Sequence, residues 1–163
     1  MAWFKRPEAA ARSVVAQLAP EPDDGPGALR AAITDVDRLV NASAGRLPTA
    51  AVVAARRITD ALSEVVDGAD VRPLDVYAAI SVKATATDYL PTTVRSYLAV
   101  DHDLVDTPRA SGRTPTESLL EQLDALETSA LAVRDAAAHQ DVDALMTQGS
   151  FLRTKFSGSD LDL

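Results

Sequence analysis

The stretch from Thr114 to about His139 constrains the fold most, because its apolar side chains recur at alternating steps of four and three. The residues of this stripe are Leu119, Leu123, Leu126, Ala130, Val133 and Ala137. That spacing places them all on one face of an α-helix. Thr114 suits the N-cap, Pro115 fits the first turn, and Glu117 can reach back to the capping residue. The stretch is therefore predicted to be a helix that packs through a face with no reactive side chain.

Glycine and proline residues divide the rest of the chain into further segments with helical periodicity. Helices are predicted at about 7–19, 26–45 and 49–68, from 73 to near 88, around 94–98, and from 141 to about 158. In the segment that starts near Pro73, the face expected to pack carries Leu74, Tyr77, Ile80 and Ala84. No segment alternates with a period of two for long enough to predict a sheet. The fold class expected is all-α, a bundle of five to seven helices.

The bundle is expected to be one domain over residues 1–163, as its length is that of an ordinary domain. Residues 20–27 combine proline, glycine and acidic residues, which is the composition of a linker. The helix predicted within residues 1–19 is therefore expected to be only loosely attached to the others.

Composition and charge argue against several classes of function. The net charge of −8 argues against nucleic-acid binding, which requires a basic face. The chain has no cysteine, which excludes disulfides, thiolate metal sites and thiol nucleophiles. Its apolar runs are shorter than the roughly 18–20 residues of a membrane span, and no apolar stretch of a signal peptide follows Lys5 and Arg6. A soluble cytoplasmic protein is expected.

One loop has residues that could bind a metal ion. Asp101, His102, Asp103 and Asp106 offer carboxylate and imidazole ligands, but the same residues are typical of a polar turn after a helix. The second histidine, His139, is explained by the dipole at a helix C-terminus. The sequence has no phosphate-binding loop, dinucleotide fingerprint or nucleophile–base spacing. We therefore predict no catalytic residue, no metal site and no cofactor.

The N-terminal hexapeptide has the composition of a docking element. Trp3 and Phe4 are followed at once by Lys5 and Arg6, ahead of the first helix-starting residue, Pro7. Aromatic rings beside cations are typical of segments that contact an anionic membrane surface or an acidic partner. The alternative is that the two rings fold back onto the bundle.

The segment 88–98, DYLPTTVRSYL, is expected to interrupt a helix. Because Leu90 precedes Pro91, it is expected to leave helical geometry, so that the helix stops or kinks near Asp88. Tyr89, Pro91 and Tyr97 are interpreted as structural residues whose rings hold the interrupted helix against its neighbours.

The same segment resembles the Tyr-Leu-Pro…Tyr-Leu element of the XpaC-like family, a neighbour of the TelA toxic-anion-resistance proteins. The helical pair from Leu119 to Phe156 is similar in kind, so the resemblance covers about half of the chain. The family is labelled for hydrolysis of 5-bromo-4-chloroindolyl phosphate, which implies a phosphatase but supplies no catalytic motif. The resemblance implies a helical accessory protein associated with the cell envelope or with stress.

Two functions follow as hypotheses. The first is a non-catalytic helical adaptor or scaffold that docks a protein partner, a second copy of itself or the inner face of a membrane. The second is a metal-dependent phosphate-ester hydrolase that uses the loop from Asp101 to Asp106. The absence of a recognisable nucleophile or phosphate cradle favours the adaptor.

Overall fold

The computed structural model describes residues 23–156, and within this range it contains helices and no strand. The α-helices are α2 (Pro26–Ser43), α3 (Thr49–Asp67), α4 (Val76–Ala84), α5 (Leu90–Leu98), α6 (Pro115–His139) and α7 (Val142–Phe156). Two short 3₁₀ turns, η1 (Gly68–Asp70) and η3 (His102–Leu104), lie in the connections, and a π-helix, η2 (Thr85–Tyr89), joins α4 to α5. The prediction of an all-α bundle is confirmed.

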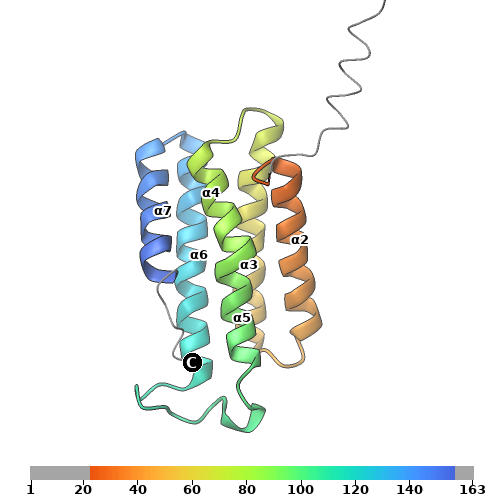
Figure 1. Cartoon of the computed structure of the whole chain (residues 1–163), viewed down its shortest axis with the longest axis vertical. Coiled ribbons are helices and arrows are strands. Elements are labelled where there is room, and N and C mark those ends of the chain that lie inside the picture. The colour runs from red at the N-terminus through yellow and green to blue at the C-terminus, as the bar shows by residue number, and fades with distance from the viewer. Residues whose placement is uncertain (1–22, 157–163) are drawn as a thin grey trace, which may run out of the picture.

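The helices run alternately up and down one long axis (Figure 1). The helix α2 runs down, α3 returns, α4 and α5 together run down again, α6 returns, and α7 descends beside the upper part of α6. The starts of α2, α4 and α7 and the ends of α3 and α6 therefore share one end of the bundle, here called the upper end. The main packing partners are α3 with α6, α2 with α3, and α7 with both α6 and α4.

The helix α6 follows its sequence signals at its start and along its buried face. Thr114 and Glu117 form the expected capping box, with the Glu117 amide donating to Thr114 Oγ1 at 3.1 Å and the Thr114 amide to Glu117 Oε2 at 2.9 Å. The stripe is buried from Leu119 to Val133, and Ala137 is half-buried. The helix ends at His139, and Gln140 adopts the left-handed conformation with φ of 56°. Packing of this stripe makes α6 the centre of the core.

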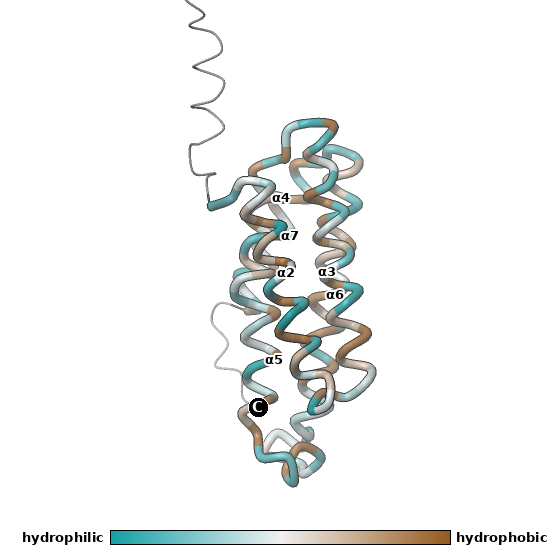
Figure 2. The backbone as a smooth tube through the Cα atoms, turned by 90° about the vertical axis from the view of Figure 1, so that its right-hand side faces the viewer, coloured by the Kyte–Doolittle hydropathy of each residue, from teal (hydrophilic) through white to brown (hydrophobic). Residues whose placement is uncertain are grey.

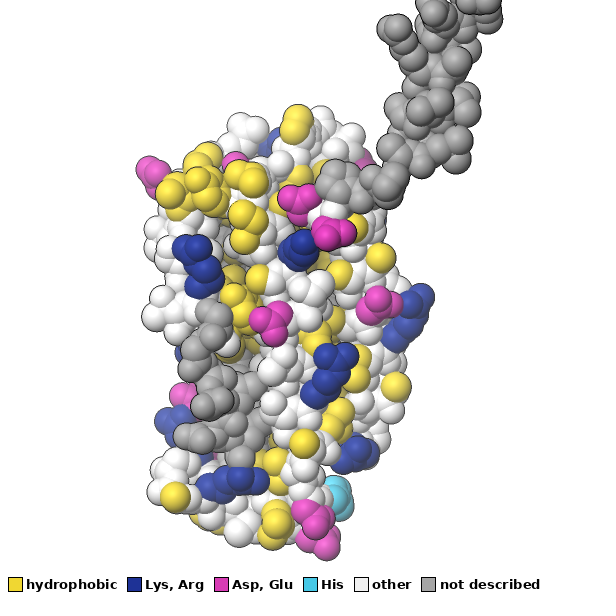
Figure 3. Space-filling view, viewed as in Figure 1, with side chains coloured by type: hydrophobic (Ala, Val, Ile, Leu, Met, Phe, Trp, Pro, Cys, Tyr) yellow, Lys and Arg dark blue, Asp and Glu magenta, His cyan; other side chains and the backbone are white. Residues whose placement is uncertain are grey.

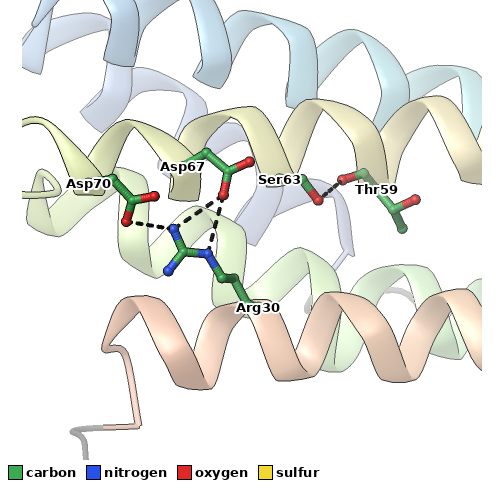
Figure 4. Close-up of polar contacts among 5 residues, drawn as sticks. All are labelled: Arg30, Thr59, Ser63, Asp67 and Asp70. Carbon is green, nitrogen blue, oxygen red and sulfur yellow. Dashed lines mark hydrogen bonds and ion pairs between the residues drawn. The ribbon is translucent and has the colours of Figure 1, made fainter.

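At the upper end, Arg30 of α2 binds the end of α3. Its Nε donates to Asp67 at 3.2 Å and its Nη2 to Asp70 at 2.9 Å (Figure 4). The hydrogen bonds that Arg30 donates to Asp70 and then to Asp67 raise the pKa of Arg30 above its usual value. Such an exposed ion pair contributes little stability, and it links the first part of α2 to the end of α3 and to η1.

The segment around Pro91 differs from the expectation. Leu90 does not leave helical geometry, because its φ of −68° and ψ of −47° are those of an α-helix. The α-helical pattern is instead interrupted by the π-helix, in which the Leu90 amide donates to the Thr85 carbonyl five residues earlier. Proline has no amide proton and crowds the preceding turn, and a wider turn accommodates both effects without breaking the helix. The prediction that Leu90 departs from helical geometry was therefore wrong.

The packing face of α4 also differs from the expectation. Three of the four buried residues of this helix have small side chains, Ala78, Ala79 and Ser81, and the fourth is Val82. Tyr77 and Ile80, which were expected in the core, remain 38% and 50% exposed. A helix that buries small side chains approaches its neighbours closely, and its larger side chains are then left at the margin.

Figure 2 shows the helices side by side, with hydrophobic and hydrophilic residues mixed along each of them. Among residues 23–156, no helix combines the length and the apolar character that a membrane crossing requires.

A candidate docking surface on α4 and α7

Large hydrophobic side chains are exposed together on α4 and α7. They are Val76, Tyr77 and Ile80 on α4, with Val142 and Met146 on α7, and they are here called the α4–α7 apolar surface. Figure 3 shows hydrophobic side chains gathered over the upper parts of these two helices. Ile80 is 50% exposed and Met146 is 46% exposed. Single exposed apolar residues are ordinary, but a contiguous group of them marks an interaction surface.

A groove of about 140 Å³ runs beside this surface, between α4 and α7. It is here called the α4–α7 groove, and its lining residues are Tyr77, Ile80, Ser81, Ala84, Tyr89, Met146, Gly149, Ser150, Leu152 and Arg153. Gly149 helps to keep it open, since it lies within α7 where any other residue would add a side chain. A Cβ at this position would lie 3.7 Å from Ser81 Oγ, which is ordinary van der Waals contact.

Ser81 gives the groove a polar group. Ser81 is only 2% exposed, and its Oγ has no hydrogen-bond partner within the described residues. A buried hydroxyl without a partner costs about 1–3 kcal/mol relative to one that is hydrogen-bonded. A ligand or partner that places a donor or acceptor against Ser81 would recover that free energy.

A larger pocket of about 640 Å³ lies at the upper end, next to the apolar surface. It is lined by Val76 and Val142, and also by Arg72 and Arg134. Both arginines are already engaged. Arg72 Nη2 donates to the carbonyls of Ala137 at 3.1 Å and Ala138 at 3.3 Å, which caps the end of α6.

Arg134 pairs with Asp135 at 2.9 Å and lies 3.6 Å from Glu64 of α3. In the larger pocket, Arg72 therefore links the connection between η1 and α4 to the end of α6, and Arg134 links α6 to α3. The apolar rim of this pocket extends the α4–α7 apolar surface.

Tyr89, Pro91 and Tyr97 are all buried, and they contact different neighbours. The Tyr89 ring lies 5.4 Å from the ring of Phe156 on α7. The Tyr97 hydroxyl lies 3.3 Å from Thr116 Oγ1 at the start of α6. The helix that carries these residues is continuous rather than broken, and their structural role stays a prediction.

The loop from Asp101 to Asp106 does not form a converging ligand set. Asp101 caps η3, accepting from the Asp103 amide at 3.5 Å, and His102 and Asp106 are exposed. Within residues 23–156, no three histidine, aspartate or glutamate side chains are grouped so that they could hold a metal ion. His139 lies at the end of α6, where its Nδ1 is 2.7 Å from the Asp135 carbonyl oxygen.

The N-terminal hexapeptide with Trp3, Phe4, Lys5 and Arg6 lies outside the described residues, as does the helix predicted at 7–19. Sequence reasoning missed the α4–α7 groove. The available signal was the glycine within α7 at residue 149, together with large apolar residues on a helix whose opposite side carries mostly small ones. Such a pattern indicates two competing faces, and the sequence does not tell which of them is buried.

Comparison of the chain with protein-family models, with curated proteins and with solved structures gives no match. The resemblance to the XpaC-like family therefore stays a prediction that depends on the residues from Asp88 to Leu98.

Proposed function

We propose that this protein is a non-catalytic helical adaptor that docks an amphipathic helix of a protein partner on the α4–α7 apolar surface. The observation that carries the proposal is the groove between α4 and α7, in which an apolar lining surrounds the unpartnered hydroxyl of Ser81. An amphipathic helix binds such a groove through apolar residues three, four and seven positions apart. A polar side chain or backbone group on the same helix would pair with Ser81.

The energetics fit reversible docking. Full burial of an Ile or Met side chain contributes about 1.5–3 kcal/mol, and about half of Ile80 and half of Met146 is exposed. Covering these two side chains would therefore contribute about 1.5–3 kcal/mol together. Tyr77 adds aromatic area with a polar tip, and Met146 can adapt its shape to different partners.

The proposal assigns the adaptor to the cytoplasm. It gives the segment from Trp3 to Arg6 the role of a second contact, with an acidic partner or with anionic lipid at the inner face of the membrane. Because the two cations would act through charge, this contact would be strongest at low salt. Deleting residues 1–6 should then reduce binding to vesicles that contain phosphatidylserine. Binding unchanged by the deletion would remove the hexapeptide from the proposal.

The experiment that tests the proposal is capture of partners from the native host by the full chain. The docking variants are Ile80→Asp and Met146→Asp, and the matched control is Val53→Asp on α3, where Val53 is 45% exposed. A partner held by the wild type and by the control, but lost from both docking variants, is the expected result. Equal capture by all four proteins, each shown by circular dichroism to be folded, would contradict the proposal.

The alternative, a phosphate-ester hydrolase, is tested with the same protein. The Asp101 loop has no converging ligands, so we expect no phosphatase activity with added Mg²⁺, Mn²⁺ or Zn²⁺. Activity that disappears in Asp101→Ala and Asp103→Ala would establish the hydrolase instead.

A further inference from the structure

We infer that the larger pocket at the upper end binds a small molecule that has a carboxylate and a short apolar chain, with Arg72 and Gln140 holding the carboxylate. The lining residues of this pocket come from α3, from the connection between η1 and α4, from α6 and from α7. The inference goes beyond the proposed function, and neither of the two depends on the other.

The first argument is the size and the lining of the pocket. Pockets that bind small molecules have volumes of about 300–1,000 Å³ and a mostly apolar lining. The larger pocket lies within this range with its volume of about 640 Å³, whereas the α4–α7 groove with about 140 Å³ does not. The lining includes Val65 and Leu145, which are 4% and 0% exposed, and also Leu74 and Val76. The pocket can therefore take up an apolar chain as well as a polar group.

The second argument is the glycine at residue 68. Gly68 lines the pocket at the end of α3, a place where glycine commonly adopts the left-handed conformation. Its φ of −57° and ψ of −24° are right-handed instead, and residues with side chains adopt such angles readily. A Cβ at this position would meet no atom within 4 Å outside the adjacent turn of the chain. Neither the backbone nor the packing requires glycine here, and its missing side chain leaves space in the pocket.

The third argument is the opposite choice at residue 140. Gln140 follows the end of α6 with a φ of 56°, at the position where glycine is most common. Within residues 23–156, no other residue except a glycine has a positive φ. Residues held in such a conformation against their preference are concentrated at functional sites. Gln140 lines the same pocket as Gly68, and its exposed side chain carries an amide that can donate hydrogen bonds.

The fourth argument is a positive charge without an acidic partner. The ionisable side chains that line the pocket are Glu64, Arg72, Asp75 and Arg134. Both acids are engaged, since Asp75 accepts from two backbone amides of its own helix and Glu64 lies 3.6 Å from Arg134. Arg134 also pairs with the neighbouring Asp135. No carboxylate of the described residues pairs with Arg72, so the charge that remains to be neutralised in the pocket is that of Arg72.

Arg72 also keeps hydrogen-bond donors for a ligand. Its Nη2 donates to the carbonyls of Ala137 and Ala138, and no bond within the described residues uses its Nε or Nη1. Hydrogen bonds from a guanidinium to a carboxylate are among the strongest in proteins. A carboxylate at Arg72 would also come within the part of the pocket that Gln140 lines. The apolar chain of the same molecule would then cover the buried valine and leucine side chains.

The test is a titration of the full ¹⁵N-labelled chain with sodium octanoate, followed through the amide chemical shifts in NMR spectra. Octan-1-ol has the same chain without the charge, and acetate has the charge without the chain. We expect octanoate to shift the amides of residues that line the pocket. It should bind about tenfold more tightly than octanol, which is the contribution of one charged hydrogen bond. Acetate should produce no shift at the same concentration.

Two glycines provide a matched pair of variants, Gly68→Leu and Gly45→Leu. Gly45 lies in the connection between α2 and α3, and a Cβ there would also meet no atom within 4 Å. Neither glycine has a positive φ, and Gly45 does not line the pocket. We expect Gly68→Leu to lose octanoate binding, because its side chain fills the pocket, and Gly45→Leu to bind as the wild type does.

The polar groups are tested by Arg72→Gln and Gln140→Gly, with the exposed Arg95→Gln of α5 as control. Arg72→Gln should weaken octanoate binding about tenfold and leave octanol binding unchanged. Gln140→Gly should weaken octanoate binding several-fold while it raises the melting temperature, because glycine suits the left-handed conformation. A merely structural role of Gln140 would raise the melting temperature and leave the affinity unchanged, which would overturn the assignment of this residue.

Absence of shifts with octanoate up to about 10 mM would overturn the inference as a whole. Equal affinities for octanoate and octanol would overturn it too, as would equal octanoate binding by Gly68→Leu and Gly45→Leu. Shifts confined to residues that line the α4–α7 groove would place the ligand on the docking surface and would also overturn it. The amide spectrum of each variant shows whether it is folded. If Gly68→Leu does not fold, the comparison of Arg72→Gln with Arg95→Gln decides.

Discussion

Two helical rods of similar length run along the bundle, and they differ in how their sequences determine the local structure. The helix α6 is one α-helix of 25 residues, and the other rod consists of α4, the π-helix and α5, with 9, 5 and 9 residues. Both begin with a side-chain cap, from Thr114 in α6 and from Asp75 in α4. The first has one apolar stripe from end to end, whereas the second changes its hydrogen-bonding pattern halfway.

The difference shows which interactions decide local structure when they disagree. In α6 the cap, the spacing and the packing all favour the same helix. In the second rod Pro91 opposes a regular helix, but Leu90 and Val94 beside it are fully or almost fully buried. Packing keeps the chain helical, and the wider turn of the π-helix accommodates Pro91. The rod that is locally irregular is also the one that borders the α4–α7 groove.

The largest expected effect comes from removing one buried leucine from each rod. Leu126 of α6 and Leu90 at the start of α5 are both 0% exposed. Leu126→Ala and Leu90→Ala should each lower the free energy of unfolding by about 2–5 kcal/mol, since each leaves a cavity. Urea denaturation measures both values. A loss below about 1 kcal/mol for Leu90→Ala alone would mean that the irregular rod is weakly packed.

A second pair of variants compares the N-terminal caps of the two rods. Thr114→Ala removes the hydroxyl that accepts from Glu117, and Asp75→Ala removes the carboxylate that accepts from the Tyr77 amide at 2.8 Å. Each should lower the free energy of unfolding by about 1 kcal/mol. Similar losses in thermal or urea unfolding would show that the two caps stabilise the protein equally. The two rods would then differ only from the π-helix onward.

A smaller effect, of opposite sign, is expected at Gly149 of α7, which packs against both rods. Because a Cβ there meets only Ser81 Oγ at 3.7 Å, Gly149→Ala should raise the free energy of unfolding by about 0.5–1 kcal/mol. The same methyl group narrows the groove, so partner capture should fall while stability rises. Destabilisation would show that the two helices cannot accommodate the methyl group.

The smallest effect is expected from Pro91→Ala. The new amide proton gains a possible partner, while the unfolded chain gains conformational freedom, so the net change should be under about 0.5 kcal/mol. Pro115→Ala, at the first turn of α6, is the matched control. A loss above 2 kcal/mol for Pro91→Ala would show that the ring itself, rather than its neighbours, holds the π-helix in place.

The sequence was sufficient to predict a helix boundary where the local signals for that boundary were present. The start of α2 at Pro26 follows from proline, and the start of α6 follows from Pro115 and the capping box. The end of α6 has no such signal, because Gln140 rather than a glycine adopts the left-handed conformation there. Asp141 caps α7 as expected, accepting from the Ala144 amide at 3.0 Å. Such signals act within a few residues, and for that reason they can be found without knowing the neighbours.

The π-helix and the burial of the α4 face could not be predicted, because both depend on contacts between helices that are far apart in the sequence. Nothing near Pro91 distinguishes a helix that stops from one that widens, because the choice is made by the core on either side. Periodicity places Tyr77 and Ile80 on one face of α4, but burial of that face depends on how far α7 extends across it. The candidate groove is a by-product of that partial coverage, and it could be found only once both helices were in place.

The π-helix has the character of a one-residue insertion in a regular helix. A related chain that lacked one residue among 85–89 could form an uninterrupted helix from Val76 onward. Because the wider turn already takes up the extra residue, everything after the deletion would keep its orientation around the axis, and Thr93, Val94 and Tyr97 would still face the neighbours that now bury them. The loss of one residue in the regular helix α6 would instead turn everything after it by about 100°. The π-helix is therefore the part of this rod in which a change of length by one residue should be tolerated best.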